Sequence, residues 1–187
     1  MVERKHIFLC YCRENSADVT QLRAELMVAG EQVWWDQDIK GGEDWKFAIR
    51  QAMRHSYAIV LCLSAETEAR TRAGIYPEAL DAINAYREHA PGHAFLIPVR
   101  LSSCEIPLIE IDGTRTLDRL KYVDLFPPEQ RELGMKRLLD AVRLVPDHPR
   151  ISAADANETK NLDRRVSDIT RRFISERSWH TLRRLLT

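Results

Sequence analysis

The chain alternates between short apolar runs and longer segments in which apolar residues recur every three or four positions. Continuous apolar runs bounded by polar residues are typical of strands buried on both faces of a parallel sheet. The runs that we interpret as strands cover residues 6–12, 32–36, 57–64, 94–101 and 122–125. The segments that we interpret as helices cover residues 16–29, 45–53, 77–88 and 128–145. This order predicts a doubly wound α/β domain over residues 1–150, with a parallel five-stranded sheet flanked by helices.

Local signals mark the ends of the first helix and the start of the second. Asn15 or Ser16 is suited to cap the first helix, and Gly30 is a natural stop at its end. The second predicted helix begins at Trp45, which lies at helical spacing from two later apolar residues. This spacing makes Trp45 a candidate core residue.

Residues 151–187 differ in character from the rest of the chain. They carry eight Lys or Arg against five Asp or Glu, and apolar residues recur among them at spacings of three and four. The apolar stripe consists of Leu162, Val166, Ile169 and Phe173. It predicts a C-terminal helical extension or a linker to a further domain. Its apolar face either docks on its own domain or forms a coiled-coil or inter-domain contact.

The composition is that of an ordinary globular protein without a charge bias. The 187 residues include 28 Lys or Arg and 28 Asp or Glu, so the formal net charge is zero. Excess positive charge dominates nucleic-acid affinity and adsorption to anionic membranes, and it is missing here. No apolar run approaches the ~20 residues that span a bilayer, and the first residues do not form a secretory signal. We therefore expect a cytoplasmic protein with no nucleic-acid or membrane partner.

The cysteine content predicts neither disulfides nor a metal site. The four cysteines are Cys10, Cys12, Cys62 and Cys104, and three of them lie inside apolar runs. We interpret them as small core residues in a reducing compartment. The pair Cys10 and Cys12 lacks the second pair of ligands that a zinc site requires.

Ligands of doubly wound folds bind beyond the carboxyl ends of the strands, so the residues that follow Cys12, Asp36 and Ser64 are the first candidates. The seven glycines form neither a G-x-G-x-x-G nor a G-x-x-x-x-G-K-[ST] loop. A dinucleotide dehydrogenase and a P-loop NTPase are therefore disfavoured. The third strand ends at Ser64 without the acidic phosphoacceptor of a receiver domain, which disfavours that class as well.

Four segments taken together resemble the TIR (Toll/interleukin-1 receptor/resistance protein) domain, most closely its bacterial members. They are residues 7–15, 29–36, 42–45 and 58–64, in this order on the predicted alternation of strands and helices. The resemblance covers residues 5–145. It implies a flavodoxin-like fold and homotypic self-assembly through the loop at residues 37–44.

The resemblance also implies a reaction. Many TIR domains are NAD⁺ glycohydrolases that use one glutamate on the helix after the third strand, and the matching residue here is Glu78. A single carboxylate is chemically plausible, because nicotinamide leaves as a neutral base and needs no general acid. Pro77 suits the first helical position, which places Glu78 in the first turn, where the helix dipole favours its ionised form. Without the resemblance, Glu78 would be interpreted as an ordinary first-turn glutamate.

Four further residues are implied to line the NAD⁺ pocket, namely Tyr11, Arg13, Trp45 and Tyr76. Arg13 is placed to meet a phosphate, whereas Trp45 either borders the pocket or belongs to the core. The family often has a tryptophan four residues before the glutamate, but this chain has Gly74 there, and Tyr76 is the nearest aromatic residue. The stacking surface for nicotinamide or for a neighbouring subunit therefore departs from the family pattern.

The resemblance leads to two functional hypotheses. The first is an NAD⁺-cleaving enzyme, active when assembled, that serves as a bacterial defence or signalling effector, with NAD⁺ as substrate and no other cofactor. The alternative is a non-catalytic TIR–TIR interaction module that recruits another TIR protein. Residues 151–187 are the candidate connection to a partner or sensor domain. Glu78 distinguishes the two hypotheses, because only the enzyme requires it.

Overall fold

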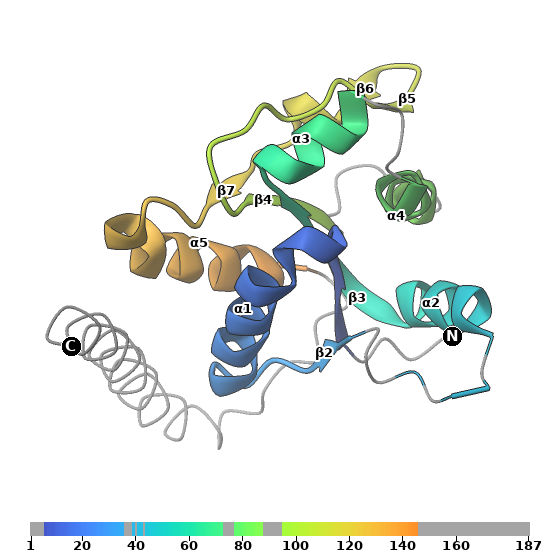
Figure 1. Ribbon diagram of the computed structural model, residues 1–187, viewed down its shortest axis with the longest axis horizontal. Helices are drawn as coiled ribbons and strands as arrows, with labels where there is room; N and C mark the ends of the chain where they lie inside the picture. Colours follow the sequence, from blue (N-terminus) through green and yellow to red (C-terminus); the bar gives the residue numbers. More distant parts are fainter. Residues whose placement is uncertain are drawn as a thin grey trace, which may run out of the picture.

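The computed structural model describes residues 6–35, 39, 41–42, 44–72, 77–87 and 95–145, built around a five-stranded sheet (Figure 1). The strands are β1 (His6–Cys10), β2 (Val33–Trp34), β3 (Ser56–Leu63), β4 (Leu96–Arg100) and β7 (Val123–Asp124). They pair in the order β2-β1-β3-β4-β7, and every pair is parallel. The predicted doubly wound, flavodoxin-like sheet is confirmed.

Helices cover both faces of this sheet (Figure 1). The helices are α1 (Ser16–Val28), α2 (Trp45–Arg54), α3 (Ala65–Arg72), α4 (Pro77–Arg87) and α5 (Arg131–Arg143). Among the described residues, short 3-10 turns also occur, namely η1 (Arg13–Asn15), η3 (Leu117–Arg119) and η4 (Pro128–Gln130). α1 and α5 share one core with the sheet, and α2 and α4 share the other.

Alternate residues of β1 supply these two cores. Ile7 and Leu9 pack on the side of α1 and α5, whereas Phe8 and Cys10 pack on the side of α2 and α4. All residues of β3 are buried, as expected for a central strand between two helical layers. β2 is shorter than predicted and only half-buried, because it lies at the edge of the sheet.

The first helix starts where it was predicted to start, but its cap differs. Asn15 occupies the N-cap position of α1, yet its side chain makes no capping hydrogen bond and is buried. Its amide instead joins a network of polar side chains that follow β1 and β3. Gly30 ends the helix as predicted, with a φ of +90°, and the following N–H of Glu31 donates to the Leu26 carbonyl at 3.0 Å.

The apolar pattern missed α3 and a small hairpin. α3 is mostly polar and shows no helical period. The hairpin consists of β5 (Glu110–Asp112) and β6 (Arg115–Thr116), which are too short for an alternating pattern. Asp112 Oδ1 closes the turn by accepting hydrogen bonds from the backbone N–H groups of Thr114 and Arg115, both at 3.0 Å. The sequence Asp112-Gly113 was the available signal for this turn.

Directional polar contacts fasten α5 to α1 and to the start of β3. Arg131 pairs with Glu25 through two hydrogen bonds of 3.0 and 2.9 Å. The buried carboxylate of Glu31 accepts from the Tyr57 hydroxyl at 2.9 Å and from Arg143 Nε at 3.2 Å. Burial, with Glu31 beside it, raises the pKa of Tyr57 above its usual range. These contacts fix the position of α5 on its face of the sheet.

The structure also bears on the cysteines and on the prediction that no segment crosses a membrane. All four cysteines are buried in the two cores, which confirms them as core residues. In the described part of the chain, no helix combines the length and apolar character needed to cross a membrane. The predicted extension at residues 151–187 lies outside the described residues.

Candidate active site

The carboxyl ends of β1 and β3 meet at the point where the winding of the sheet reverses. β1 has β2 on one side and β3 on the other, so the chain adds β2 at one side of β1 and then adds β3 at the opposite side. Doubly wound folds bind their ligands at this point. The residues of η1 and of the start of α3, which follow the two strands, therefore form the floor of the candidate site.

The floor is a buried network of polar side chains. Asn15 Oδ1 accepts hydrogen bonds from the Ser64 hydroxyl at 2.8 Å and from the Cys12 thiol at 2.7 Å. Ser64 Oγ caps α3 by accepting from the Thr67 N–H at 3.1 Å. All four residues are at most 3% exposed. Since these buried polar groups satisfy one another, the network joins η1 firmly to α3.

Glu66 lies at the rim of this network, in the first turn of α3. Asn15 Nδ2 donates to Glu66 Oε2 at 3.3 Å. Hydrogen bonds from its own backbone N–H, from Ser64 and from Asn15 lower the pKa of the Glu66 carboxyl. The carboxylate is therefore held in its ionised form beside the carboxyl ends of β1 and β3. Sequence analysis missed Glu66, although a serine followed by acidic residues is a signal for the start of a helix.

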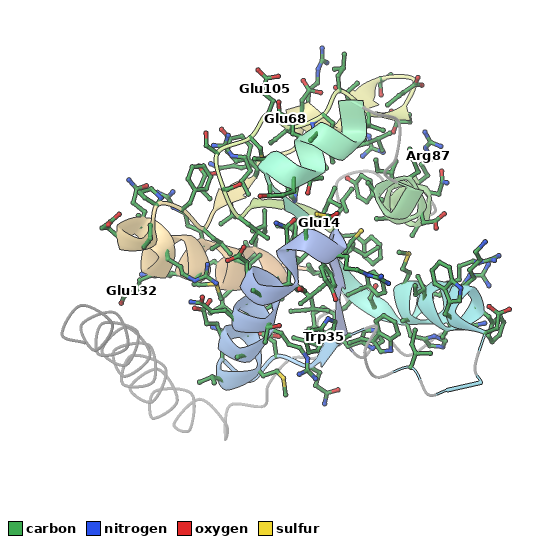
Figure 2. The ribbon with its side chains drawn as sticks, in the orientation of Figure 1. Glu14, Trp35, Glu68, Arg87, Glu105 and Glu132 are labelled. Atoms are coloured by element: carbon green, nitrogen blue, oxygen red, sulfur yellow. The ribbon has the colours of Figure 1, made fainter. Side chains whose placement is uncertain are left out.

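Tyr11 and Arg13 follow β1 but have different surroundings. Tyr11 packs against the core on the side of α1 and α5, and its hydroxyl accepts a hydrogen bond from Trp35 Nε1 at 2.6 Å. It therefore lies on the opposite face of the sheet from α4. Arg13 is exposed in η1, beside Glu14, which Figure 2 labels at the carboxyl end of β1. The contribution of Tyr11 and Arg13 to binding stays a prediction.

Glu78 is the second residue of α4 and directly follows Pro77. The structure thus confirms that α4 begins at Pro77 and that Glu78 lies in its first turn. The next residue along, Ala79, is fully buried in the core shared with β1 and β3. The catalytic role of Glu78 stays a prediction.

Trp45 begins α2 and is 55% exposed, so the alternative that it is a core residue is wrong. Phe47, in the same turn, is 60% exposed. Asp44 caps this turn by accepting from the Phe47 N–H at 3.1 Å. In the loop that precedes it, Gly42 adopts a φ of +91°, a conformation that favours glycine. Tyr76 lies outside the described residues, as does half of the loop at residues 37–44.

The described side chains at this edge supply charge rather than metal ligands. Within the described ranges, no group of three or more His, Cys, Asp or Glu is placed to hold a metal ion. Glu14 and Glu66 bring negative charge close together, since Glu14 acts on the pKa of Glu66. Arg13 adds one exposed guanidinium. Carboxylates of this kind stabilise a developing cation, and a guanidinium binds phosphate.

Comparison with known proteins decides the family. The sequence profile of a family described as the TIR domain matches residues 7–139. The chain belongs to the TIR domain family. No curated protein matches it.

Solved structures resemble this TIR domain in fold. A prokaryotic SEFIR domain is 16% identical with a TM-score of 0.51, over 80% of this chain and 99% of that one. The TIR domain of the Toll-related receptor TRR-2 from Hydra magnipapillata is 19% identical with a TM-score of 0.54, over 73% of this chain and 97% of that one. A TIR-STING receptor from C. gigas, solved in complex with 2′,3′-cGAMP, is 19% identical with a TM-score of 0.54. That match covers 76% of this chain and 40% of the receptor.

These likenesses support the TIR fold and leave the activity open. TIR domains include NAD⁺-cleaving enzymes and scaffold modules, and they self-associate. The residues of this TIR domain that would distinguish an enzyme from a scaffold are those around the carboxyl ends of β1 and β3 and at the start of α4.

Proposed function

We propose that this TIR domain is an NAD⁺ glycohydrolase that cleaves the bond between nicotinamide and ribose, with Glu78 as the catalytic carboxylate. The observation that carries the proposal is a glutamate in the first turn of α4, directly after Pro77, in a chain whose TIR match spans residues 7–139. A helix N-terminus favours the ionised carboxylate that the reaction requires.

The chemistry needs little more than one well-placed negative charge. Nicotinamide departs from a positively charged pyridinium as a neutral base, so no acid has to protonate it. The ribose left behind is oxocarbenium-like, and the Glu78 carboxylate stabilises it electrostatically. The product depends on the nucleophile that then adds to the ribose C1. Water, on losing a proton, gives ADP-ribose, whereas another nucleophile gives a cyclic isomer or a base-exchanged nucleotide.

The remaining parts of the substrate call for binding groups. We assign Arg13, exposed beside the buried network, to a phosphate of NAD⁺. Trp45 and Tyr76 are the residues that we assign as aromatic surface for a base. Tyr11 follows the carboxyl end of β1 but packs on the face of the sheet opposite α4. NAD⁺ is the substrate, and the reaction needs no separate cofactor.

The test compares two glutamates at the same helical position. Glu78→Ala removes the carboxylate at the second position of α4. Glu132→Ala removes the carboxylate at the second position of α5, a helix on the other face of the sheet. NAD⁺ consumption is followed by chromatography with concentrated, crowded protein. We expect Glu78→Ala to lose about 100-fold or more in kcat, the scale of losing a transition-state charge contact. Glu132→Ala should keep the wild-type rate.

The alternative function is a non-catalytic TIR–TIR interaction module. The exposed aromatic pair Trp45 and Phe47, at the end of the loop at residues 37–44, favours it, because such residues are typical anchors of interfaces. Wild type and Glu78→Ala protein that are equally inert, even when forced to assemble, would establish this alternative. Activity that depends on Glu78 supports the enzyme, for which the family alone implies the role of an assembly-activated effector in bacterial defence or signalling.

A further inference from the structure

The helix that carries Glu78 is held at its other end by the β5–β6 hairpin. Arg87, the last residue of α4, donates from Nη2 to the Glu110 carbonyl at 2.9 Å and from Nε to the Ile111 carbonyl. Its Nη1 also donates to Asn84 Oδ1 at 2.8 Å. One guanidinium therefore ties the last turn of α4 to consecutive carbonyls of β5. Figure 2 labels Arg87 on the side of α4 that lies toward the hairpin.

A second contact joins the same two elements. Arg115 of β6 donates from Nη1 to the Tyr86 hydroxyl at 3.2 Å and lies 5.3 Å from the centre of the Tyr86 ring. Asp112 orients Arg115 by accepting from its Nε at 2.6 Å. Cation–π interactions and charge-assisted hydrogen bonds are directional, so they fix the rotation of α4 about its axis and its position relative to the hairpin.

The hairpin is itself anchored and does not follow α4 passively. Ile111 of β5 and Leu117, directly after β6, are completely buried in the core that α4 shares with the sheet. The α4 residues in that core are Ala79, Ala82, Ile83 and Tyr86, and the two nearest to Glu78 along the helix are the small Ala79 and Ala82, whose contacts are not directional. The hairpin thus supplies the orientation that these small apolar contacts leave less defined.

A small movement at this contact is enlarged at the other end of the helix. Tyr86 and Glu78 are eight positions apart, which is about 12 Å along a helix that rises ~1.5 Å per residue. A tilt of ~5° about Tyr86 would move the backbone of Glu78 by about 1 Å, and a displacement of that size can cost ~100-fold in rate.

We propose that the β5–β6 hairpin is a positioning element for Glu78, which acts through Arg87 and the Tyr86–Arg115 contact to fix the orientation of α4. This inference rests on the proposed function, since it assigns the hairpin to the same reaction. Arg87, Tyr86 and Arg115 are positioning residues and are not expected to touch NAD⁺.

The decisive variant is Arg87→Met, which keeps the apolar stem and removes the three donors. Tyr86→Phe is a milder second variant that removes only the hydroxyl, and Arg87→Lys restores one donor. The matched control is Arg131→Met, which breaks the Arg131–Glu25 pair between α5 and α1 on the other face of the sheet. Each protein is assayed for kcat and KM on NAD⁺ and for backbone hydrogen exchange of α4, β1 and β3.

We expect Arg87→Met to lower kcat by about 10- to 100-fold while KM stays within about threefold, because the loss is of geometry in the transition state. Tyr86→Phe should lose less, and Arg87→Lys should recover part of the rate. Exchange should accelerate in α4 while β1 and β3 stay protected. Arg131→Met should keep kcat within about threefold of wild type and leave the exchange of α4 unchanged.

Three outcomes would overturn the proposal. They are an unchanged kcat in Arg87→Met, an equal loss of kcat in Arg131→Met, and faster exchange throughout the sheet, which would show general destabilisation. If the wild-type protein does not cleave NAD⁺, the proposed function has failed. The exchange of α4 in Arg87→Met still decides whether the hairpin holds this helix, and unchanged exchange would refute that.

Discussion

Asn15 shows how the role of a residue depends on what folding brings beside it. An asparagine just before a helix is a good cap, and Asn15 does occupy the cap position. Its Oδ1 instead accepts from Cys12 and Ser64, because these groups are buried at the ends of β1 and β3 and need partners. Ser64 is 49 positions away, so the chain pattern around Asn15 contains no sign of this contact.

His6 is the residue whose environment gives a testable pH dependence. Burial, opposed by a hydrogen bond to the Ala52 carbonyl and assisted by nearby His55, lowers the pKa of His6 below its usual 6.5. The unfolded chain therefore binds this proton first as the pH falls through 6.5. Stability from the neutral ring is fully present above that value and is lost toward the lower pKa of the folded state.

We expect the urea midpoint of wild-type protein to fall between pH 7.5 and 5.5, and to fall less in His6→Gln. Glutamine keeps a donor for the Ala52 carbonyl, whose oxygen lies 2.9 Å from His6 Nε2, but it does not titrate. Comparing the two proteins cancels the carboxylates that titrate in both. Equal pH dependence in wild type and variant would mean that His6 does not contribute.

At the scale of elements, Gly134 sets how closely α5 approaches β7. A Cβ at this position would overlap with the backbone carbonyl of Asp124 and crowd the Leu125 side chain. Gly134→Ala should therefore destabilise the domain by about 1–3 kcal/mol, although alanine is favoured over glycine in helices by about 1 kcal/mol. Chemical denaturation measures the difference.

The control for Gly134→Ala is Arg137→Ala, an exposed position on the same helix, which should change stability by less than about 0.5 kcal/mol. A Gly134→Ala protein as stable as wild type, or more stable, would show that α5 can shift away from β7 without cost.

The elements that could be predicted from the sequence are those with a long, regular pattern. β3 is apolar throughout because both of its faces are buried, so its run was conspicuous. α3 lacks a pattern because it is mostly polar, and its position is set by Ser64 and by the Ser102 hydroxyl, which accepts from the Ala65 N–H at 3.0 Å. Contacts between distant segments of this kind are not encoded in local periodicity.

The candidate site was predictable only in part, for a similar reason. The start of α4 followed from Pro77, whose fixed φ suits the first helical position, and this placed Glu78 in the first turn. Glu66 was missed, because the hydrogen bonds that lower the pKa of its carboxyl come from its own backbone N–H, from Ser64 and from Asn15, and Asn15 is 51 positions away along the chain. The hydrogen bonds from Arg87 to β5 were also missed, because they require a hairpin that the pattern of apolar residues did not predict.

At the scale of the whole molecule, activity is expected to depend on protein concentration. The loop at residues 37–44 is the segment through which TIR self-assembly is proposed. Ordering Gly41 and Gly42 costs more backbone entropy than ordering other residues, and contacts with a neighbouring subunit would offset this cost. The competent site is then populated mainly in the assembly, so the rate per subunit should rise with concentration.

The loop offers two disruptive variants and a matched control for this last prediction. Gly42 has a φ of +91°, which proline cannot adopt, so Gly42→Pro should abolish the rise, as should Ile39→Asp by placing a charge in the contact. Gly41→Ala is the control, because a Cβ there would meet nothing within 4 Å and Gly41 is not among the positive-φ residues. It should keep a rate that rises with concentration, with the rise shifted to lower concentration, because alanine loses less backbone entropy on ordering than glycine. Specific activity is measured across a dilution series, with assembly followed by light scattering. A rate per subunit that stays constant from dilute to concentrated protein, with Gly42→Pro and Ile39→Asp fully active, would instead establish a preformed site in the monomer.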